Sequence, residues 1–210
     1  MTDAPVNTQR AARPGSSSPG EILAEAMGRS EPLERYQTLL PRVAAALRDC
    51  ECTTVDRIAM WMAQLGHESG GLTYMEEIAD GSAYEGRTDL GNIQAGDGPR
   101  YKGRGPIQLT GRDNYAAVSL WAHGRNLVPS PTFFVDEPGR LAGDRFGFLG
   151  VVWYWTVARD LNAFADGGDL EGATRAINGG LHGIKDRRAR WKRCRRLGTR
   201  LLTVREVRPT

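Results

Sequence analysis

Two glutamates, each set beside glycines, are the residues of this 210-residue chain best suited to acid–base chemistry. Glu68 stands in the segment Gly66–Gly71, and Glu85 stands in Tyr84-Glu85-Gly86-Arg87, within a glycine-rich stretch. Two carboxyl groups facing one cleft can divide proton donation and water activation between them, as hydrolysis of a glycosidic bond requires. Four acidic neighbours are equally suited to the role of Glu85: Glu76, Glu77, Asp80 and Asp89.

A run of polar residues follows the two glutamates. Gln108, Thr110 and Asn114 surround an expected junction between a loop and a helix. Short polar groups at such a junction can orient a water molecule or bind the N-acetyl groups of a sugar. Thr110 could equally cap the helix that follows it. Asn178, before Gly179-Gly180, could end a helix or contact a ligand.

The histidines and cysteines do not form a metal-binding pattern. His67-Glu68 begins like the His-Glu-x-x-His motif of zinc proteases, but Gly71 occupies the position of the second histidine. The other two histidines are distant in sequence, and the three cysteines lack the regular spacing of a zinc site. We therefore expect no metal and no cofactor.

Helical periodicity governs most of the chain and indicates how the glutamates are positioned. A capping pair, Thr53 with Asp56, predicts a helix that runs to the glycines at 66–71 and carries Glu68 at its end. Glu85 falls in a long loop system, residues 70–105. Loops of this length in a compact domain are usually functional or disordered.

The remaining predicted elements are also helical. Apolar residues predict one helix over 33–40 and a second that begins at Pro41. Further helices are expected over 113–122, 146–161 and 169–178, with a basic final helix over 187–202. Strand signals are few and short. The sequence thus predicts a mainly α fold.

Composition divides the chain into three parts. Residues 1–19 are rich in Pro, Ser, Gly, Ala and Thr and are expected to be a disordered linker or tail. Residues 20–203 form the expected catalytic domain, and residues 204–210 a C-terminal tail. No apolar run is long enough to span a bilayer, and the N-terminus lacks the apolar core of a signal peptide.

Charge is distributed unevenly along the chain. The net charge is +3, but residues 185–208 contain eleven Lys or Arg and two acidic residues, a charge of +9. The rest of the chain therefore carries −6. A basic end favours a polyanionic partner such as an anionic cell wall, anionic lipid or nucleic acid, although it could also be a solvated helix face.

Several separated motifs resemble glycoside hydrolase family 19, the chitinase-like family that includes phage and bacterial cell-wall lysins. They occur in the family's order and span about residues 55–193. The matching pieces are His67–Gly71, Tyr84–Asn92, Tyr101–Thr110 with Asn114-Tyr115, and Ile177–Leu181.

The resemblance implies a lysozyme-like, two-lobed helical fold with a long substrate cleft. By that similarity Glu68 is the general acid, Glu85 the general base, and Thr110 the hydroxyl residue that positions the attacking water. The implied substrate-binding residues are His67, Tyr101, Gln108, Asn114, Asn178 and Arg187, with Arg188 and Arg190 as alternative matches to the family's arginine. The family inverts configuration at β-1,4 links and needs no metal.

The absence of cysteines from the motif region makes the chain similar to the loop-reduced bacterial and phage members of the family. That similarity implies an endolysin that cleaves the link between N-acetylmuramic acid and N-acetylglucosamine in peptidoglycan. We expect a monomer that stays in the host cytoplasm until a separate phage pore protein releases it to the wall, without nucleic-acid binding or stable membrane insertion. The alternatives are a chitinase and a non-catalytic module that binds wall glycan.

Overall fold

The protein is built almost entirely from helices, and the computed structural model describes residues 17–208. The α-helices of this part are α1 Pro19–Met27, α2 Leu33–Asp49, α3 Val55–Glu68, α4 Asp97–Arg100, α5 Arg112–His123, α6 Phe133–Asp136, α7 Asp144–Trp153, α8 Leu161–Asp166, α9 Leu170–Asn178, α10 Ile184–Leu197 and α11 Arg200–Glu206. Short 3-10 helices cover Ser82–Tyr84, Thr88–Leu90 and Pro138–Ala142, and a π-helical segment covers Tyr154–Ala158. β Structure among the described residues is limited to isolated bridges from Arg104 to Glu76 and to Leu109. The predicted mainly α class is confirmed.

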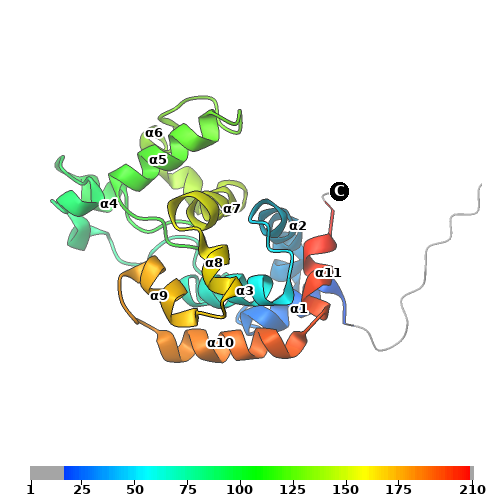
Figure 1. The fold of residues 1–210 in the computed structure, drawn as a ribbon. Helices are drawn as coiled ribbons and strands as arrows, with labels where there is room; N and C mark the ends of the chain where they lie inside the picture. Colours follow the sequence, from blue (N-terminus) through cyan, green and yellow to red (C-terminus); the bar gives the residue numbers. More distant parts are fainter. Residues whose placement is uncertain (1–16, 209–210) are drawn as a thin grey trace, which may run out of the picture.

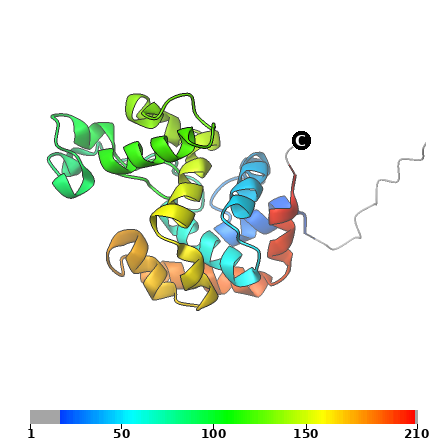
Figure 2. The same cartoon turned by 45° about the horizontal axis from the view of Figure 1, so that its top comes forward.

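Helix α3 is the central helix, and it carries Glu68 as its last residue. Helices α1, α8, α10 and α11 pack against it, and every residue from Ile58 to Gly66 is buried (Figures 1 and 2). Its Trp61 ring stacks on Phe148 of α7, with 6.4 Å between the ring centroids. The cap is Thr54, one residue later than predicted, which accepts a hydrogen bond from the Arg57 amide. A helix enclosed in this way holds Glu68 at a fixed place.

Two predicted helix boundaries were wrong. Pro41 does not begin a new helix but lies inside α2, because apolar positions on both sides of it, including Leu39 and Val43, are buried in one core. The predicted final helix is divided at Gly198, which has a φ of +59°. After this break α11 runs to Glu206 and buries Val204, so the boundary drawn at residue 203 falls inside a helix.

The described chain begins with a complete helix cap. The Ser18 hydroxyl accepts a hydrogen bond from the Glu21 amide, and the Glu21 carboxylate accepts one from the Ser18 amide. Ser18 and Pro19, which the linker predicted over 1–19 included, thus belong to the cap and the start of α1; residues 1–16 of that prediction lie outside the described part. In residues 17–208, none of the helices has the length and apolar character needed to traverse a bilayer.

The segment between α3 and α5 forms a separate layer with α4, drawn above α9 and α10 in Figure 1. Its anchor is Asp97, which is almost fully buried and forms an ion pair with Arg112 of α5. Asp97 also accepts a hydrogen bond from the Gln94 amide at 3.0 Å. The Arg112 guanidinium lies 4.8 Å from the centroid of the Tyr101 ring. One buried carboxylate thus ties the long loop to α5.

We expect Asp97→Asn to lower the free energy of unfolding by about 2–3 kcal/mol at pH 7, because it removes a charged acceptor from Arg112. The hydrogen bond from Arg112 holds the pKa of Asp97 below its ordinary value, against the opposing effect of burial. The stabilisation is therefore present above about pH 4 and is lost as the pH falls through the folded-state pKa. Urea unfolding at pH 7 and pH 3 measures both effects.

Glu137→Gln, which breaks an exposed pair with Arg140, is the control and should cost less than about 1 kcal/mol. An equal loss in both variants would contradict the anchoring role.

Candidate active site

The Glu68 side chain is held by a buried arginine. Arg187 on α10 donates from Nη2 to Glu68 Oε1, and the two form an ion pair between α3 and α10. The Arg187 side chain is 1% exposed, whereas that of Glu68 is 17% exposed. Glu68 therefore keeps contact with solvent on one side while Arg187 fixes it on the other, as a carboxyl group that must reach a substrate requires.

Arg187 is itself fixed by neutral groups around it. It donates from Nη1 to the Gln64 side chain and from Nε to the His182 carbonyl at 3.2 Å. Gln64 lies one helical turn before Glu68 and donates to the Thr174 hydroxyl of α9 at 3.3 Å. The guanidinium is thus satisfied from three sides, which is necessary for a buried charge. Among the three arginines that the sequence could not separate, Arg187 is the one that contacts Glu68; Arg188 pairs with Glu171 and Arg190 with Asp186.

Tyr154 is a neighbour of this network that the sequence pattern did not reveal. It begins the π-helical segment after α7, and its hydroxyl donates to the Ile177 carbonyl at 3.1 Å. Burial raises the pKa of Tyr154, and the nearby Glu68 carboxylate acts in the same direction. π-Helical turns are frequently found at functional sites. The helix expected over 146–161 is interrupted at this segment.

His67 pairs with another side chain of α10. Its Nδ1 atom lies 2.8 Å from Asp186 Oδ2, and the same oxygen accepts a hydrogen bond from Arg190 Nε at 2.7 Å. Gly183 is required beside this ring, because a Cβ there would lie 2.1 Å from it. Neighbouring residues on each helix therefore form two cross-links between α3 and α10, His67 with Asp186 and Glu68 with Arg187. His67, which we expected to bind substrate, also positions the helix that carries Arg187.

Asp186→Asn should lower the melting temperature near neutral pH, and the difference from the unaltered protein should vanish in acid. Burial acts to raise the pKa of Asp186, but hydrogen bonds from His67 and Arg190 outweigh it and hold this pKa below its ordinary value. The carboxylate thus stabilises the fold above about pH 4, and this contribution disappears as the pH falls through the folded-state pKa. Thermal unfolding followed from pH 7 to pH 2.5 tests the expectation. A difference that persists unchanged at pH 2.5 would contradict it, and Asp49→Asn at the exposed end of α2 is the control.

Three predicted site residues are joined in one chain of hydrogen bonds. The Thr110 hydroxyl donates to the Gln108 carbonyl at 2.9 Å, and the Asn114 amide donates to the Thr110 carbonyl at 2.7 Å. Gln108 has a φ of +53°, an uncommon value for a residue other than glycine, and its side chain donates to the Gly105 carbonyl at 3.0 Å. Such backbone strain is concentrated at functional sites. These three residues therefore lie together where the loop meets α5, and their part in substrate binding stays a prediction.

Glu77 is the carboxylate that lies beside this chain of polar groups. Its Oε2 accepts a hydrogen bond from the Gly103 amide at 3.0 Å, and its Oε1 accepts one from the Tyr84 hydroxyl at 2.9 Å. A Cβ on Gly103 would lie 3.2 Å from Glu77 Oε2 and 2.7 Å from Gln108 Oε1. The Glu77 carboxylate and the side-chain oxygen of Gln108 therefore both lie close to Gly103, where a side chain would collide with them. Burial and the bond to Glu77 raise the pKa of Tyr84, so this phenol remains a donor near neutral pH.

Glu85 has a different position from the one expected for a base. Its two carboxylate oxygens accept hydrogen bonds from the Gly96 and Gly98 amides, at 2.7 and 2.8 Å. A Cβ on Gly98 would lie 2.6 Å from the Glu85 backbone nitrogen, so this close approach requires glycine. Both oxygens of Glu85 therefore close the loop around the start of α4.

Two further predicted binding residues act mainly within the fold. Tyr101 is 1% exposed, its ring packs against Tyr115, and its hydroxyl donates to the Val135 carbonyl, so we correct it from a sugar contact to a core residue. Asn178 donates to the His182 carbonyl and accepts from the Gly180 amide, both at 3.0 Å. Because Arg187 also donates to the His182 carbonyl, Asn178 stabilises the turn that supports Arg187.

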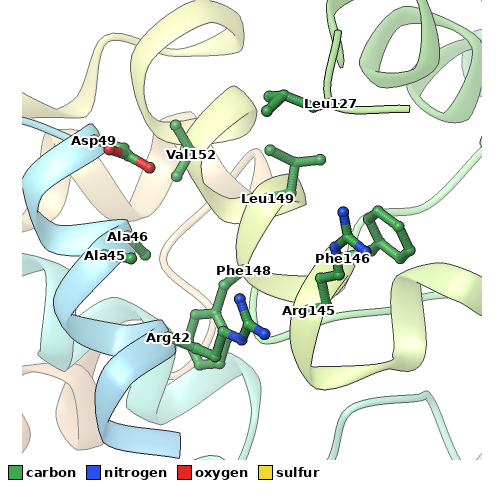
Figure 3. Close-up of a pocket in the computed structure, with 10 residues that line it drawn as sticks. All are labelled: Arg42, Ala45, Ala46, Asp49, Leu127, Arg145, Phe146, Phe148, Leu149 and Val152. Carbon is green, nitrogen blue, oxygen red and sulfur yellow. The ribbon is translucent and has the colours of Figure 1, made fainter. Parts of the chain in front are cut away.

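Other candidate sites in the described part lie away from Glu68. A cavity of about 160 Å³ lies between α2 and α7. It is lined mostly by apolar side chains such as Leu127 and Leu149 and by none of the predicted site residues (Figure 3). Within residues 17–208, no group of three or more His, Cys, Asp or Glu is arranged to hold a metal ion. The three cysteines are free and buried, and burial raises the pKa of Cys52 and of Cys194 to about 12.

Comparison with known families and proteins identifies relatives of this chain. The profile described as "Chitinase class I" matches residues 41–167. A glycosyl hydrolase family 19 domain-containing protein of Haemophilus influenzae is 32% identical in an alignment of 176 residues that covers 69% of this chain and 82% of that protein. An endochitinase of Arabidopsis thaliana is also 32% identical, over 73% of this chain. The match spans about half, 51%, of the plant protein.

Solved structures share the fold at lower identity. A bacterial family 19 chitinase aligns with a TM-score of 0.63 at 23% identity, covering 85% of this chain and 93% of that one. The class IV chitinase of Zea mays aligns with a TM-score of 0.55 at 21% identity, covering 91% and 92%. The helical arrangement in Figure 1 is therefore the one that these chitinases have.

Proposed function

Because this chain belongs to glycoside hydrolase family 19, the chitinase class I family, and is thus a glycoside hydrolase, we propose that it hydrolyses peptidoglycan. The bond we assign is the β-1,4 link between N-acetylmuramic acid and N-acetylglucosamine. Cleavage proceeds with inversion, so a general acid protonates the leaving oxygen while a general base activates water on the opposite face of the sugar.

The observation that carries the proposal is the ion pair between Glu68 and the buried Arg187. It supports Glu68 as the general acid, since this carboxyl group is fixed by its neighbours and still reaches solvent. To serve as the acid, Glu68 must hold a proton on the oxygen that Arg187 does not bind, which is Oε2.

For the general base we propose Glu77 in place of Glu85. Glu77 lies over Gly103 beside the Gln108 side chain and accepts one hydrogen bond from a backbone amide and one from the Tyr84 hydroxyl, whereas Glu85 is bound by two backbone amides at the start of α4. Thr110 and Asn114 continue the polar row, and we assign Thr110 to the attacking water and Gln108 and Asn114 to the N-acetyl groups of the sugar.

Chitin is the second candidate substrate, and the similarity to plant endochitinases favours it. Chitin and peptidoglycan share the β-1,4 backbone with N-acetyl groups, so the same acid and base would serve both. We place peptidoglycan first because the basic C-terminal part of the chain favours an anionic polymer over neutral chitin.

In its biological setting we propose a phage endolysin that acts as a monomer. It would accumulate in the host cytoplasm and reach the wall after a separate phage pore protein opens the membrane. The similarity of the chain to a bacterial family 19 protein over most of that protein's length supports a bacterial setting.

Mass spectrometry of digested peptidoglycan and of chitin oligomers tests the proposed bond. Fragments with a reducing N-acetylmuramic end, absent from a Glu68→Gln digest, are the expected result. Fragments with a reducing glucosamine end would replace the muramidase assignment with a glucosaminidase. Release from chitin alone would make the protein a chitinase, and no release from either polymer would favour a binding module.

A further inference from the structure

One face of helix α10 is a continuous row of exposed cations. Five Lys or Arg side chains on this helix are exposed and together form what we call the basic stripe: Lys185, Arg188, Lys192, Arg195 and Arg196. At about 100° per residue, these five positions fall within an arc of about 100° on the helix. The stripe runs for about 16 Å along the axis at 1.5 Å per residue. A row of this length can contact several successive anionic groups of a linear polymer.

Few acidic side chains neutralise this stripe. The only acid on α10 is Asp186, which is turned toward His67 and Arg190 instead. From neighbouring helices, Glu171 pairs with Arg188 at 2.9 Å and Asp56 pairs with Arg195 at 3.1 Å. Lys185, Lys192 and Arg196 form no ion pair within residues 17–208. Five cations and two acids leave the stripe with a charge of +3.

The opposite face of α10 belongs to the catalytic region. Arg187 and Cys194 are buried there, and Arg187 contacts Glu68. One rigid helix thus presents the basic stripe to solvent on one side and holds the catalytic carboxyl group on the other. A polymer bound along the stripe would remain a fixed, short distance from the active site.

We propose that the basic stripe binds a linear phosphate-bearing polymer attached to the cell wall, and so retains the enzyme on its substrate. This inference rests on the proposed action on peptidoglycan. The ligand chemistry is a repeating phosphodiester, which a row of lysine and arginine side chains neutralises by releasing counterions. The stripe contributes wall retention and takes no part in cleavage of the glycosidic bond.

The composition of the stripe disfavours two other anionic partners. An interfacial membrane helix combines a basic face with exposed large apolar residues, but none of the large exposed apolar side chains of residues 17–208 lies on α10 or α11. Single-stranded nucleic acid is usually bound with aromatic side chains on which bases stack. The one aromatic residue of α10, Trp191, is only partly exposed and lies under the Arg195 guanidinium.

The test compares two triple variants in a pelleting assay with insoluble walls. The stripe variant is Lys185→Gln, Lys192→Gln and Arg196→Gln, and the control is Arg42→Gln, Arg125→Gln and Arg140→Gln, three exposed arginines outside α10. Both triples remove three positive charges. Walls that carry the phosphate polymer are compared with walls from which acid has stripped it, at salt concentrations from 50 to 300 mM, roughly the range in which such binding weakens.

We expect the stripe variant to bind polymer-bearing walls at least about tenfold more weakly at low salt than the control does, with a log–log salt slope smaller by about 2. Hydrolysis of a soluble oligosaccharide should be unchanged, so failure of this proposal is distinguishable from failure of the proposed activity. The proposal would be overturned if both triple variants bound polymer-bearing walls equally well. It would also be overturned if the unaltered protein bound stripped walls as well as polymer-bearing walls. Tighter binding of the unaltered protein to anionic vesicles or to single-stranded DNA than to the polymer would also overturn it.

Discussion

Replacement of Glu68 by glutamine is expected to lower kcat on glycan by about 10³-fold, within the usual range for loss of general acid catalysis. The amide cannot give a proton to the leaving oxygen, although it fills almost the same volume. Arg187 would lose its ionic partner but keep the Gln64 side chain and the His182 carbonyl as acceptors. Release of reducing ends gives the rate, and urea unfolding shows whether the variant remains folded.

Glu25→Gln is a suitable control for this variant, because Glu25 is a partly exposed glutamate that also lies within 3.9 Å of an arginine, Arg29. Its rate should match that of the unaltered protein. A Glu68→Gln protein that remains folded and retains a tenth or more of the activity would exclude Glu68 as the acid. If Glu68→Gln lost both its activity and its fold, Glu68→Asp would be tested next. It keeps a carboxyl group, so it would show whether the loss of activity comes from the missing acid or from unfolding.

The position of Glu68 could be predicted because it depends on local signals. The apolar periodicity of α3, a threonine cap and the glycines after the helix are all contained within residues 54–71. The helix predicted over 169–178 depends on the same kind of signal, since Asp169 caps α9 by accepting a hydrogen bond from the Gly172 amide at 2.7 Å. Local cues of this type are independent of how distant segments meet.

Features that depend on distant contacts could not be predicted in this way. Pro41 costs α2 a hydrogen bond, and only the buried core on both sides of it explains why the helix continues. Arg187, Arg188 and Arg190 are equivalent in the sequence pattern, but the first is buried against Glu68 and the second is 46% exposed. Likewise, the pairing of His67 with Asp186 joins residues 119 positions apart.

The choice between Glu77 and Glu85 is the clearest case of this limit, because both lie in the same loop system with similar neighbours. What separates them is the fold of residues 96–105. The Gly96 and Gly98 amides bind the Glu85 carboxylate, whereas the Gly103 amide holds Glu77 beside Gln108. Glu85 therefore stabilises the loop, and Glu77 is left with the polar groups that can order a water molecule.

The matched variants Glu77→Gln and Glu85→Gln should therefore have different effects: the first should lower activity, and the second should lower stability. Glu77→Gln is expected to lower kcat by about 10²–10³-fold with little effect on the fold, as for loss of a general base. Glu85→Gln is expected to lower the free energy of unfolding by about 1–2 kcal/mol, because the glutamine side chain has a single accepting oxygen and leaves one of the two backbone amides without its acceptor. Its kcat should fall no more than a few-fold.

Steady-state rates on a soluble oligosaccharide and urea unfolding of both variants measure the two effects. If Glu85→Gln abolished turnover while Glu77→Gln remained active, Glu85 would be the base, and its carboxylate would have to leave the Gly96 and Gly98 amides when substrate binds.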